Sequence, residues 1–477
     1  MTASTTPETW FHITLGDVVR VSSGMGFPQK YQGKQEGIYP VYKVGDISNA
    51  VINHKGKAFL AGNYVGELEA NELKGEIFCE GATLFAKIGE AIKLNRRAFV
   101  TRAGLADNNV MAVIPEKLIS KRFIYYFMRT VDLTDASRST TVPSIRKGDI
   151  ECLPLNIPSQ AEQKEIADRL DILLAQVEAT QARLVHIPEI IKNFRQSVLS
   201  DAVSGKLTEE WRNKNNTTPP KEVWSSAKET RSPYLIPEGW LSVTLGSISE
   251  KVSVGHVGKT TEFYTEQPDG IPFLRSQNVR PGGISKNGLA LIKKEAHESL
   301  KKSQLKPGDL LVVRVGANRG DACILPDIFD AVNCANIVFS RPLKGLSEYL
   351  NIFFQSPIAQ SLLLGETVGG AQGVINTKSV ASAFVALPSH EEQIEIVRRV
   401  EQLFAYADTI EQQAKAAKAR VDKLTQAILA KAFRGELTAD WRAANPDLIS
   451  GDNSAAALLA GIQAERAAAK PRKNRRV

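Results

Sequence analysis

Long apolar runs are absent from this sequence of 477 residues, of which 43% are hydrophobic. No stretch of about 18 consecutive apolar residues occurs, so we expect no membrane-spanning helix. The N-terminus, MTASTTPETWFHITL, lacks a charged segment followed by an apolar one, so we do not expect a signal peptide. Together these absences predict a cytoplasmic protein.

Cysteine and histidine are scarce, and neither is clustered. The four cysteines are Cys79, Cys152, Cys323 and Cys334, and no two of them have the spacing of a metal-ligand pair. The six histidines are scattered along the chain. The sequence therefore indicates neither a metal site nor a disulfide framework.

Motifs of common enzymes are missing as well. The chain has no Gly-x-x-x-x-Gly-Lys-Ser/Thr loop for ATP, no Gly-x-Ser-x-Gly and no His/Glu metal motif. An amino-methyltransferase would carry Asn/Asp-Pro-Pro before an aromatic residue, whereas residues 218–221 read TPPK. The glycine-rich segment 368–373, VGGAQG, does not follow a strand and open a helix as a dinucleotide-binding loop does. These absences favour a chain that binds and scaffolds without catalysing a reaction.

The charge balance is moderately basic. Sixty Lys and Arg residues exceed 52 Asp and Glu residues, which gives a net charge of +8 and a pI near 9.1. An excess of positive charge favours an anionic partner, and nucleic acid is the commonest such partner.

The most informative feature is an internal repeat. Residues 158–212 recur at 388–442 after a shift of 230 positions without a gap, and 17 of the 55 positions are identical. Apolar residues three and four apart predict a coiled-coil seam in both copies. At 1.5 Å per residue, about 43 helical residues would form a rod of roughly 60 Å. We expect the two helices to pack antiparallel with the globular parts at opposite ends; the alternative is two unrelated surface helices.

The ends of both helices carry capping signals. Ser159 and Ser389 are each followed three residues later by glutamate, which is the spacing of a capping box. Gly205 and Gly435 suit a left-handed C-cap. Pro188 is expected to kink or interrupt the first helix, because proline lacks a backbone N–H.

The repeat divides the chain into six segments. The opening of the first globular part returns 230 residues later, where Thr14-Leu15-Gly16 is matched by Thr244-Leu245-Gly246. We predict an α+β protein with two globular α/β domains containing twisted sheets, two long antiparallel helices and a pseudo-two-fold repeat. The predicted boundaries are a first domain at 1–157, a first helix region at 158–212, a linker at 213–236, a second domain at 237–387, a second helix region at 388–442 and a tail at 443–477.

These motifs resemble the DNA specificity (S) subunits of type I restriction–modification enzymes. The resemblance rests on the Pro-Ser-x-x-Glu-Gln-x-Glu-Ile start and the Gly-x-Leu-Thr-x-x-Trp-Arg end of each repeat, which match that family's conserved regions, and it covers the whole chain. The match is especially close in residues 392–409 and 424–459, where the chain resembles the enteric, K-12-like subfamily.

The resemblance implies a non-catalytic subunit in a bacterial defence system. Each globular domain would be a target-recognition domain, and the two would read the halves of a split, asymmetric site in double-stranded DNA. Two methylation (M) subunits would bind the chain for adenine-N6 methylation, and two restriction/translocase (R) subunits would add ATP-dependent restriction. S-adenosylmethionine, ATP and Mg would bind to those partners, and no cofactor would bind to this chain.

Candidate DNA contacts follow from side-chain chemistry, because Arg pairs with guanine edges and Asn or Gln pairs with adenine edges. The segment 275–280, RSQNVR, is the strongest candidate, and a solvated strand edge is its alternative. The first-domain candidates are Lys43, Arg96, Arg97, Arg138, Ser139 and Thr140. For Arg96 and Arg97 a plain surface charge pair is the favoured alternative. The second-domain candidates are Arg275, Gln277, Asn278, Arg280, Arg314, Asn318, Arg319 and Gln372. Lys259, Lys286 and Lys55 could instead contact phosphates, which position a protein without specifying sequence.

Four residues off or beyond the helix seam are candidate partner contacts: Leu174, Phe404, Trp211 and Trp441. Alternatively, both tryptophans pin the chain to its own domains. Two other functions stay open from the sequence. A self-sufficient DNA methyltransferase would bind S-adenosylmethionine as an isolated chain, and a non-DNA coiled-coil scaffold would bind no duplex even with partners present.

Overall fold

The computed structural model describes residues 6–137, 143–365 and 374–469. Contacts divide the chain into two compact units. Unit 1 combines residues 1–184 with 417–477, and unit 2 comprises 185–416. Each long helix therefore contributes one half to each unit. None of the described helices is both long and apolar enough to cross a membrane.

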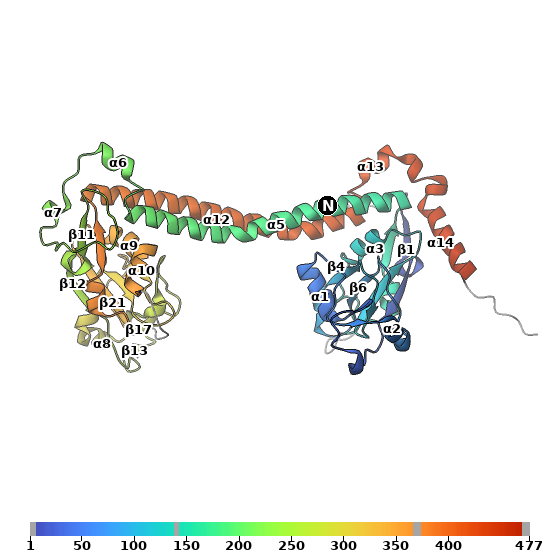
Figure 1. The fold of residues 1–477 in the computed structure, drawn as a ribbon, viewed down its shortest axis with the longest axis horizontal. Helices are drawn as coiled ribbons and strands as arrows, with labels where there is room; N and C mark the ends of the chain where they lie inside the picture. Colours follow the sequence, from blue (N-terminus) through green and yellow to red (C-terminus); the bar gives the residue numbers. More distant parts are fainter. Residues whose placement is uncertain (1–5, 138–142, 366–373, 470–477) are drawn as a thin grey trace, which may run out of the picture. The chain divides into compact units, whose positions relative to one another are not determined.

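The globular part of unit 1 contains two principal sheets (Figure 1). The larger sheet has the order β2-β9-β6-β7-β4, and its strands are β2 (Val19–Ser23), β9 (Val110–Pro115), β6 (Thr83–Ala86), β7 (Arg97–Val100) and β4 (Lys57–Ala58). The smaller sheet has the order β5-β3-β8, formed by β5 (Tyr64–Val65), β3 (Tyr39–Tyr42) and β8 (Leu105–Ala106). Apolar and β-branched residues fill β6 and β9, which are buried on both faces over most of their length.

The globular part of unit 2 repeats this plan. Its first sheet has the order β12-β21-β18-β19, with β12 (Ser249–Val254), β21 (Ile337–Pro342), β18 (Leu310–Val313) and β19 (Ala322–Ile324). Its second sheet has the order β13-β17-β14-β20, with β13 (Tyr264–Thr265), β17 (Ala290–Ile292), β14 (Ile271–Leu274) and β20 (Asn333–Cys334). The predicted α+β class with two sheet-containing domains is confirmed.

Two further helices of unit 1 can be compared with unit 2, and one of them has a helical counterpart there. In unit 1 they are α1 (Val44–Asn53) and α3 (Lys121–Met128), and α3 buries every residue from Phe123 to Met128. In unit 2 the counterpart of α3 is α9 (Ser347–Gln355), whereas a 3-10 turn, η5 (Ser276–Asn278), stands in place of α1.

The two long helices, α5 (Gln160–Val203) and α12 (His390–Phe433), pack antiparallel within each unit (Figure 1). In unit 1 the Gln181 amide donates to Asp422 Oδ1 at 3.1 Å. In unit 2 Arg195 pairs with Asp408. Arg195 comes after Gln181 along α5, whereas Asp408 comes before Asp422 along α12, so the two helices run in opposite directions. The predicted antiparallel pairing is thus confirmed.

Helix α5 continues through Pro188, so the predicted interruption was wrong. Pro188 is exposed, and its ring removes one backbone hydrogen bond from a helix of 44 residues. Packing against α12 on both sides of this position stabilises the helix, since most helical stability in proteins comes from tertiary contacts.

Each long helix is followed by a segment that packs on a globular domain. After α5, α6 (Glu209–Lys214) and α7 (Pro220–Val223) lead to Trp224 and Ala227, which are buried in the core of unit 2. After α12, α13 (Ala439–Ala444) leads to α14 (Ala455–Ala469), whose Ile462 is buried in the core of unit 1. The segment predicted as a linker is therefore partly a core element of unit 2.

Candidate nucleic-acid interface

Lys43 and Arg275 occupy the same position in the two domains, directly after β3 and β14. The Lys43 amide donates to Asp46 Oδ2 at 2.8 Å, and the Arg275 amide donates to Asn278 Oδ1 at 3.0 Å. Each residue thus begins a turn that is capped from three residues ahead. The Lys43 ammonium donates to Gln32 Oε1 at 3.0 Å, and Arg275 Nη2 donates to the Gly288 carbonyl at 2.8 Å.

A second matched pair follows the central strands β6 and β18. The Lys87 amide donates to the Asn109 carbonyl at 2.9 Å, and the Arg314 amide donates to the Asn336 carbonyl at 3.4 Å. The Lys87 carbonyl accepts from the Ile145 amide, and the Arg314 carbonyl accepts from the Ile375 amide. Arg314 was a sequence candidate, but Lys87 was missed. Aligning the two apolar runs that precede these residues would have identified Lys87.

The structure brings the two candidate segments of the second domain together. Both the Ser276 hydroxyl and the Arg314 amide donate to the Asn336 carbonyl, at 3.3 and 3.4 Å. Arg280 lies 3.8 Å from Asp321, and it also contacts Asn318 once the Asn318 amide is oriented with its oxygen toward the guanidinium. Burial raises the pKa of the Asp321 carboxyl, and the positive charge of Arg280 opposes that shift.

Two candidates have structural roles instead. Asn278 is fully buried, and its side chain caps η5 and donates to the carbonyls of Ser285 and Asn287. Arg97 is 4% exposed and donates to the Asn95 and Val131 carbonyls. Neither side chain is available to a base edge, so both predictions are corrected. A capping Asn and a base-reading Asn look alike in sequence, which explains the first error.

The remaining candidates are distributed over the surface or lie outside the described residues. Gln277 and Lys259 are exposed, and Arg319 and Arg96 are half-buried. Arg96 belongs to a cleft of the first domain rather than to the Lys43 and Lys87 positions. The candidates outside the described residues are Arg138, Ser139, Thr140 and Gln372.

The motifs that delimit the repeat meet around two buried glutamates. Ser159 and Ser389 do cap the helices, since their hydroxyls accept from the amides of Glu162 and Glu392 at 3.2 Å. The capping box is not completed, because the glutamate carboxylates point to other partners. Glu162 accepts from Trp10, Thr438 and Arg442, and Glu392 accepts from Trp240, Thr208 and Arg212. We call each group a glutamate clasp.

The left-handed C-caps predicted at the helix ends are confirmed. Gly205 and Gly435 both have φ of +77°. The added Cβ of an alanine would also approach Pro237 Cγ to 2.3 Å at Gly205 and Pro7 Cγ to 2.4 Å at Gly435. Glycine is therefore required at both positions for conformation and for space.

The candidate partner contacts are not equivalent. Leu174 is 4% exposed and packs in the core of unit 1, so its burial does not support a role in partner binding. Its counterpart Phe404 is partly buried in unit 2 beneath the Arg195 guanidinium, 5.7 Å from the ring centroid. Trp211 and Trp441 are half-buried.

Comparison with known proteins identifies the family. The family described as "Type I restriction modification DNA specificity domain" matches residues 7–189 and 237–418. The chain belongs to this family. It is 36% identical to the EcoBI specificity subunit of Escherichia coli, over 97% of this chain and 93% of that protein. It is also 36% identical to the EcoKI specificity subunit of Escherichia coli strain K12, over 98% of both chains.

The fold of this specificity subunit is shared with a solved structure. The HsdS subunit from Thermoanaerobacter tengcongensis superposes with a TM-score of 0.58, covering 90% of this chain and 98% of that chain at 18% identity. The resemblance found in the sequence is thereby confirmed, including the enteric relatives. The relatives are named specificity subunits, so the chain is the DNA-specificity component of a type I system and not its catalytic component.

Proposed function

We propose that this specificity subunit reads a split, asymmetric DNA sequence with its two domains. One observation carries the proposal: equivalent strand ends bear a cation in both domains, Lys43 and Lys87 in the first and Arg275 and Arg314 in the second. The same backbone frame thus presents lysine in one domain and arginine in the other. Arginine pairs with guanine through two hydrogen bonds, whereas lysine is a point donor, so the two domains are suited to different sequences.

The antiparallel helices support a spacing role within this proposal. Each helix joins the cores of both units, because the start of α5 and the end of α12 pack in unit 1 and the other halves pack in unit 2. A continuous helix pair would fix the distance between two half-sites, so the number of unread base pairs between them would matter more than their identity.

We further propose that two copies of a methylation subunit dock on the repeated helix ends. Most of the identical repeat residues have an internal role in the structure, such as the glutamates, threonines and arginines of the clasps. Trp211 and Trp441 are exceptions. In the described parts of the chain, neither indole makes a side-chain hydrogen bond or ring contact. Identical, half-exposed tryptophans at equivalent places suit one partner that binds twice.

The catalytic groups belong to the partners in this proposal. S-adenosylmethionine would bind to the methylation subunits, and ATP and Mg would bind to the two restriction/translocase subunits. The described residues of this chain contain no group of three or more His, Cys, Asp or Glu side chains that could hold a metal ion. The support for this division is the family to which the chain belongs.

Mapping of N6-methyladenine in the host genome tests the proposed function. We expect one bipartite motif with a fixed gap, which disappears when the gene for this chain is deleted and returns when the gene is restored. Persistence of every methylated motif after deletion would contradict the proposal. Binding of S-adenosylmethionine by the isolated chain would instead favour a self-sufficient methyltransferase.

A further inference from the structure

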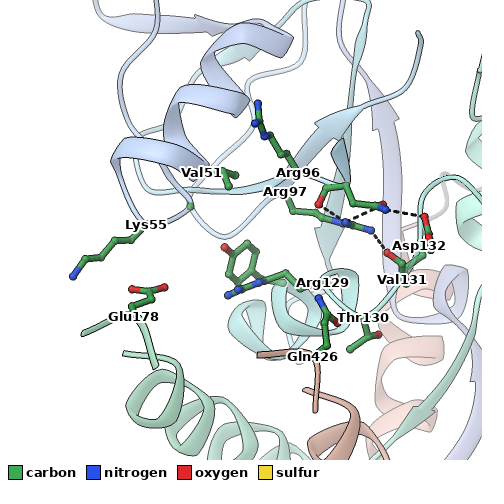
Figure 2. A pocket seen from close by; sticks show the side chains of 13 residues that line it. Val51, Lys55, Arg96, Arg97, Arg129, Thr130, Val131, Asp132, Glu178 and Gln426 are labelled. Carbon is green, nitrogen blue, oxygen red and sulfur yellow. Dashed lines mark hydrogen bonds between the residues drawn. The ribbon is translucent and has the colours of Figure 1, made fainter. Parts of the chain in front are cut away.

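A cleft of about 460 Å³ lies within unit 1, between the first globular domain and the long helices (Figure 2). Lys55 and Gly56 line it from the turn after α1, Arg129 from the end of α3, and Glu178 and Gln426 from α5 and α12. Figure 2 shows Arg129 between Lys55 and Glu178 on one side and Asp132 on the other. This cleft has no role in the arrangement of strand ends described above.

The lining carries more positive than negative charge. Four cations and two carboxylates line it, namely Lys55, Arg96, Arg97 and Arg129 against Asp132 and Glu178. Asp132 is already engaged, since its Oδ1 accepts from Asn95 Nδ2 at 2.8 Å and from the Thr134 hydroxyl at 2.7 Å. The internal carboxylates therefore do not balance the guanidinium groups.

Arg97 supplies independent evidence for unbalanced charge. Its side chain is buried, its Nη atoms donate only to neutral oxygens, and its Nε has no partner among the described residues. Burial and the nearby Arg129 lower the pKa of the Arg97 guanidinium to about 10, although Asp132 opposes the shift. A buried cation that lacks a paired carboxylate is costly, and an anion in the cleft would compensate for it.

The equivalent cleft of the second domain lacks these cations. Arg97 on β7 lies opposite Phe85 on β6, and in the second domain Ala322 on β19 lies opposite Val312 on β18. Ala322 therefore takes the place of Arg97. Counted from the helix N-caps Ser120 and Leu346, Arg129 corresponds to Gln355. The second cleft, of about 910 Å³, is lined instead by four carboxylates and two cations, namely Glu348, Glu401, Asp408 and Glu411 with Lys192 and Arg195.

One residue from each long helix is matched between the two clefts, while most of the other charged lining residues differ. Glu178 and Gln426 correspond under the 230-residue shift to Asp408 and Gln196, which line the second cleft. A protein that docked identically on both repeats would meet clefts of opposite charge. The ligand of the cationic cleft is therefore specific to the first half of the molecule.

We propose that the cleft formed by Lys55, Arg96 and Arg129 binds a backbone phosphate of the DNA at the half-site of the first domain. This assignment rests on the proposed function. A guanidinium group matches a phosphate with two parallel hydrogen bonds, and Lys55 adds a mobile point charge at the rim. A phosphate contact positions the duplex and carries no sequence information. The cleft thus anchors one half-site asymmetrically.

The salt dependence of DNA binding tests the assignment in the full-length chain assembled with its methylation subunits. Arg129→Gln introduces the residue found at the equivalent place, Gln355, and Arg96→Gln and Lys55→Gln remove the other charges. Removal of one cation that binds a phosphate should reduce the slope of log K against log salt by about 0.9 and weaken binding roughly three- to tenfold at 0.15 M salt. The methylated sequence should stay the same.

Lys117→Gln is the matched control. Lys117 is exposed and precedes α3, whereas Arg129 follows the other end of that helix, so this variant removes one charge outside the cleft. Thermal unfolding should show that all variants are folded. If Arg129→Gln does not fold, Lys55→Gln still tests the assignment, because Lys55 is exposed. Salt slopes that equal the wild-type slope in all the folded cleft variants would overturn the assignment.

Two outcomes separate this inference from the proposed function. If the wild-type complex binds and methylates its duplex while the cleft variants do so with unchanged slopes, only the cleft assignment fails. If calorimetry detects pyrophosphate binding that Arg129→Gln abolishes, with duplex binding unchanged, the cleft takes a free phosphorylated ligand and the DNA assignment is again overturned. Failure of the wild-type complex to bind any duplex would contradict the proposed function itself.

Discussion

Thr438 donates a hydrogen bond to Glu162 Oε1 at 2.7 Å across 276 residues of chain. The counterpart bond, from Thr208 to Glu392 Oε1, also measures 2.7 Å. In each clasp the other glutamate oxygen accepts from a tryptophan near the start of a domain, Trp10 at 3.0 Å or Trp240 at 2.8 Å. One buried carboxylate thus joins the start of one long helix, the segment that follows the other and the residue that precedes the first strand of a domain.

Glu162→Gln should destabilise unit 1 by roughly 3 kcal/mol, because it leaves the largely buried Arg442 guanidinium without a counter-charge. Glu162 is fully buried, and the Arg442 side chain is 15% exposed. Urea unfolding followed by circular dichroism measures the change. Asp440→Asn is the control, since Asp440 is 74% exposed and pairs with Arg169 at the surface, where solvent screens an ion pair and its contribution to stability is small. Equal stability of the two variants would refute the clasp.

The cysteines should react in two classes. Cys79 and Cys152 are exposed, whereas Cys323 and Cys334 are buried, and burial raises the pKa of the Cys323 thiol to about 12 and that of Cys334 further. Because the thiolate is the reactive form, a thiol reagent at pH 8 should modify two cysteines rapidly in the native protein and four after denaturation. Mass spectrometry identifies the sites, and rapid modification of Cys334 in the folded protein would contradict the structure.

The repeat made the helices and their caps predictable. Ser159, Gly205 and their counterparts obey local capping rules, and the apolar period of the seam fixes which face of each helix is buried. The clasp was not predictable, because the spacing of Glu162 fits a capping box, and only the fold brings Trp10 and Thr438 to it.

The candidate DNA contacts were harder to predict than the helices. Residue chemistry selected Lys43, Arg275 and Arg314, but it also selected Arg97, whose neighbours across the sheet bury it. Lys87 escaped notice because no cluster of polar residues surrounds it in sequence, and its significance comes from the backbone position that it shares with Arg314.

Replacement of Trp211 and Trp441 by alanine should weaken assembly with the methylation subunits. Truncation of a buried interface tryptophan commonly costs about 2 kcal/mol or more, so we expect affinity to fall roughly thirtyfold or more. Analytical ultracentrifugation measures the assembly. Tyr406→Ala, at an exposed aromatic residue of α12, is the control for loss of a surface ring. Unchanged assembly of a folded double variant would indicate that both tryptophans serve only their own domains.

Insertion of four residues at matching places in α5 and α12 should lengthen the helix pair by about 6 Å. Since DNA rises about 3.4 Å per base pair, the preferred gap between half-sites should grow by one or two base pairs with both half-sites unchanged. Methylation mapping detects this change. A variant that assembles and methylates with its original gap would refute the spacing role of the helices.

The central claim, that each domain reads one half-site, is tested most directly by mapping methylated adenines for two matched variants. Lys43→Ala with Lys87→Ala alters the first domain, and Arg275→Ala with Arg314→Ala alters the second. The account predicts that each variant relaxes the sequence of a different half of the motif and leaves the other half and the gap intact. Relaxation of the same half by both variants, or of both halves by either one, would contradict it.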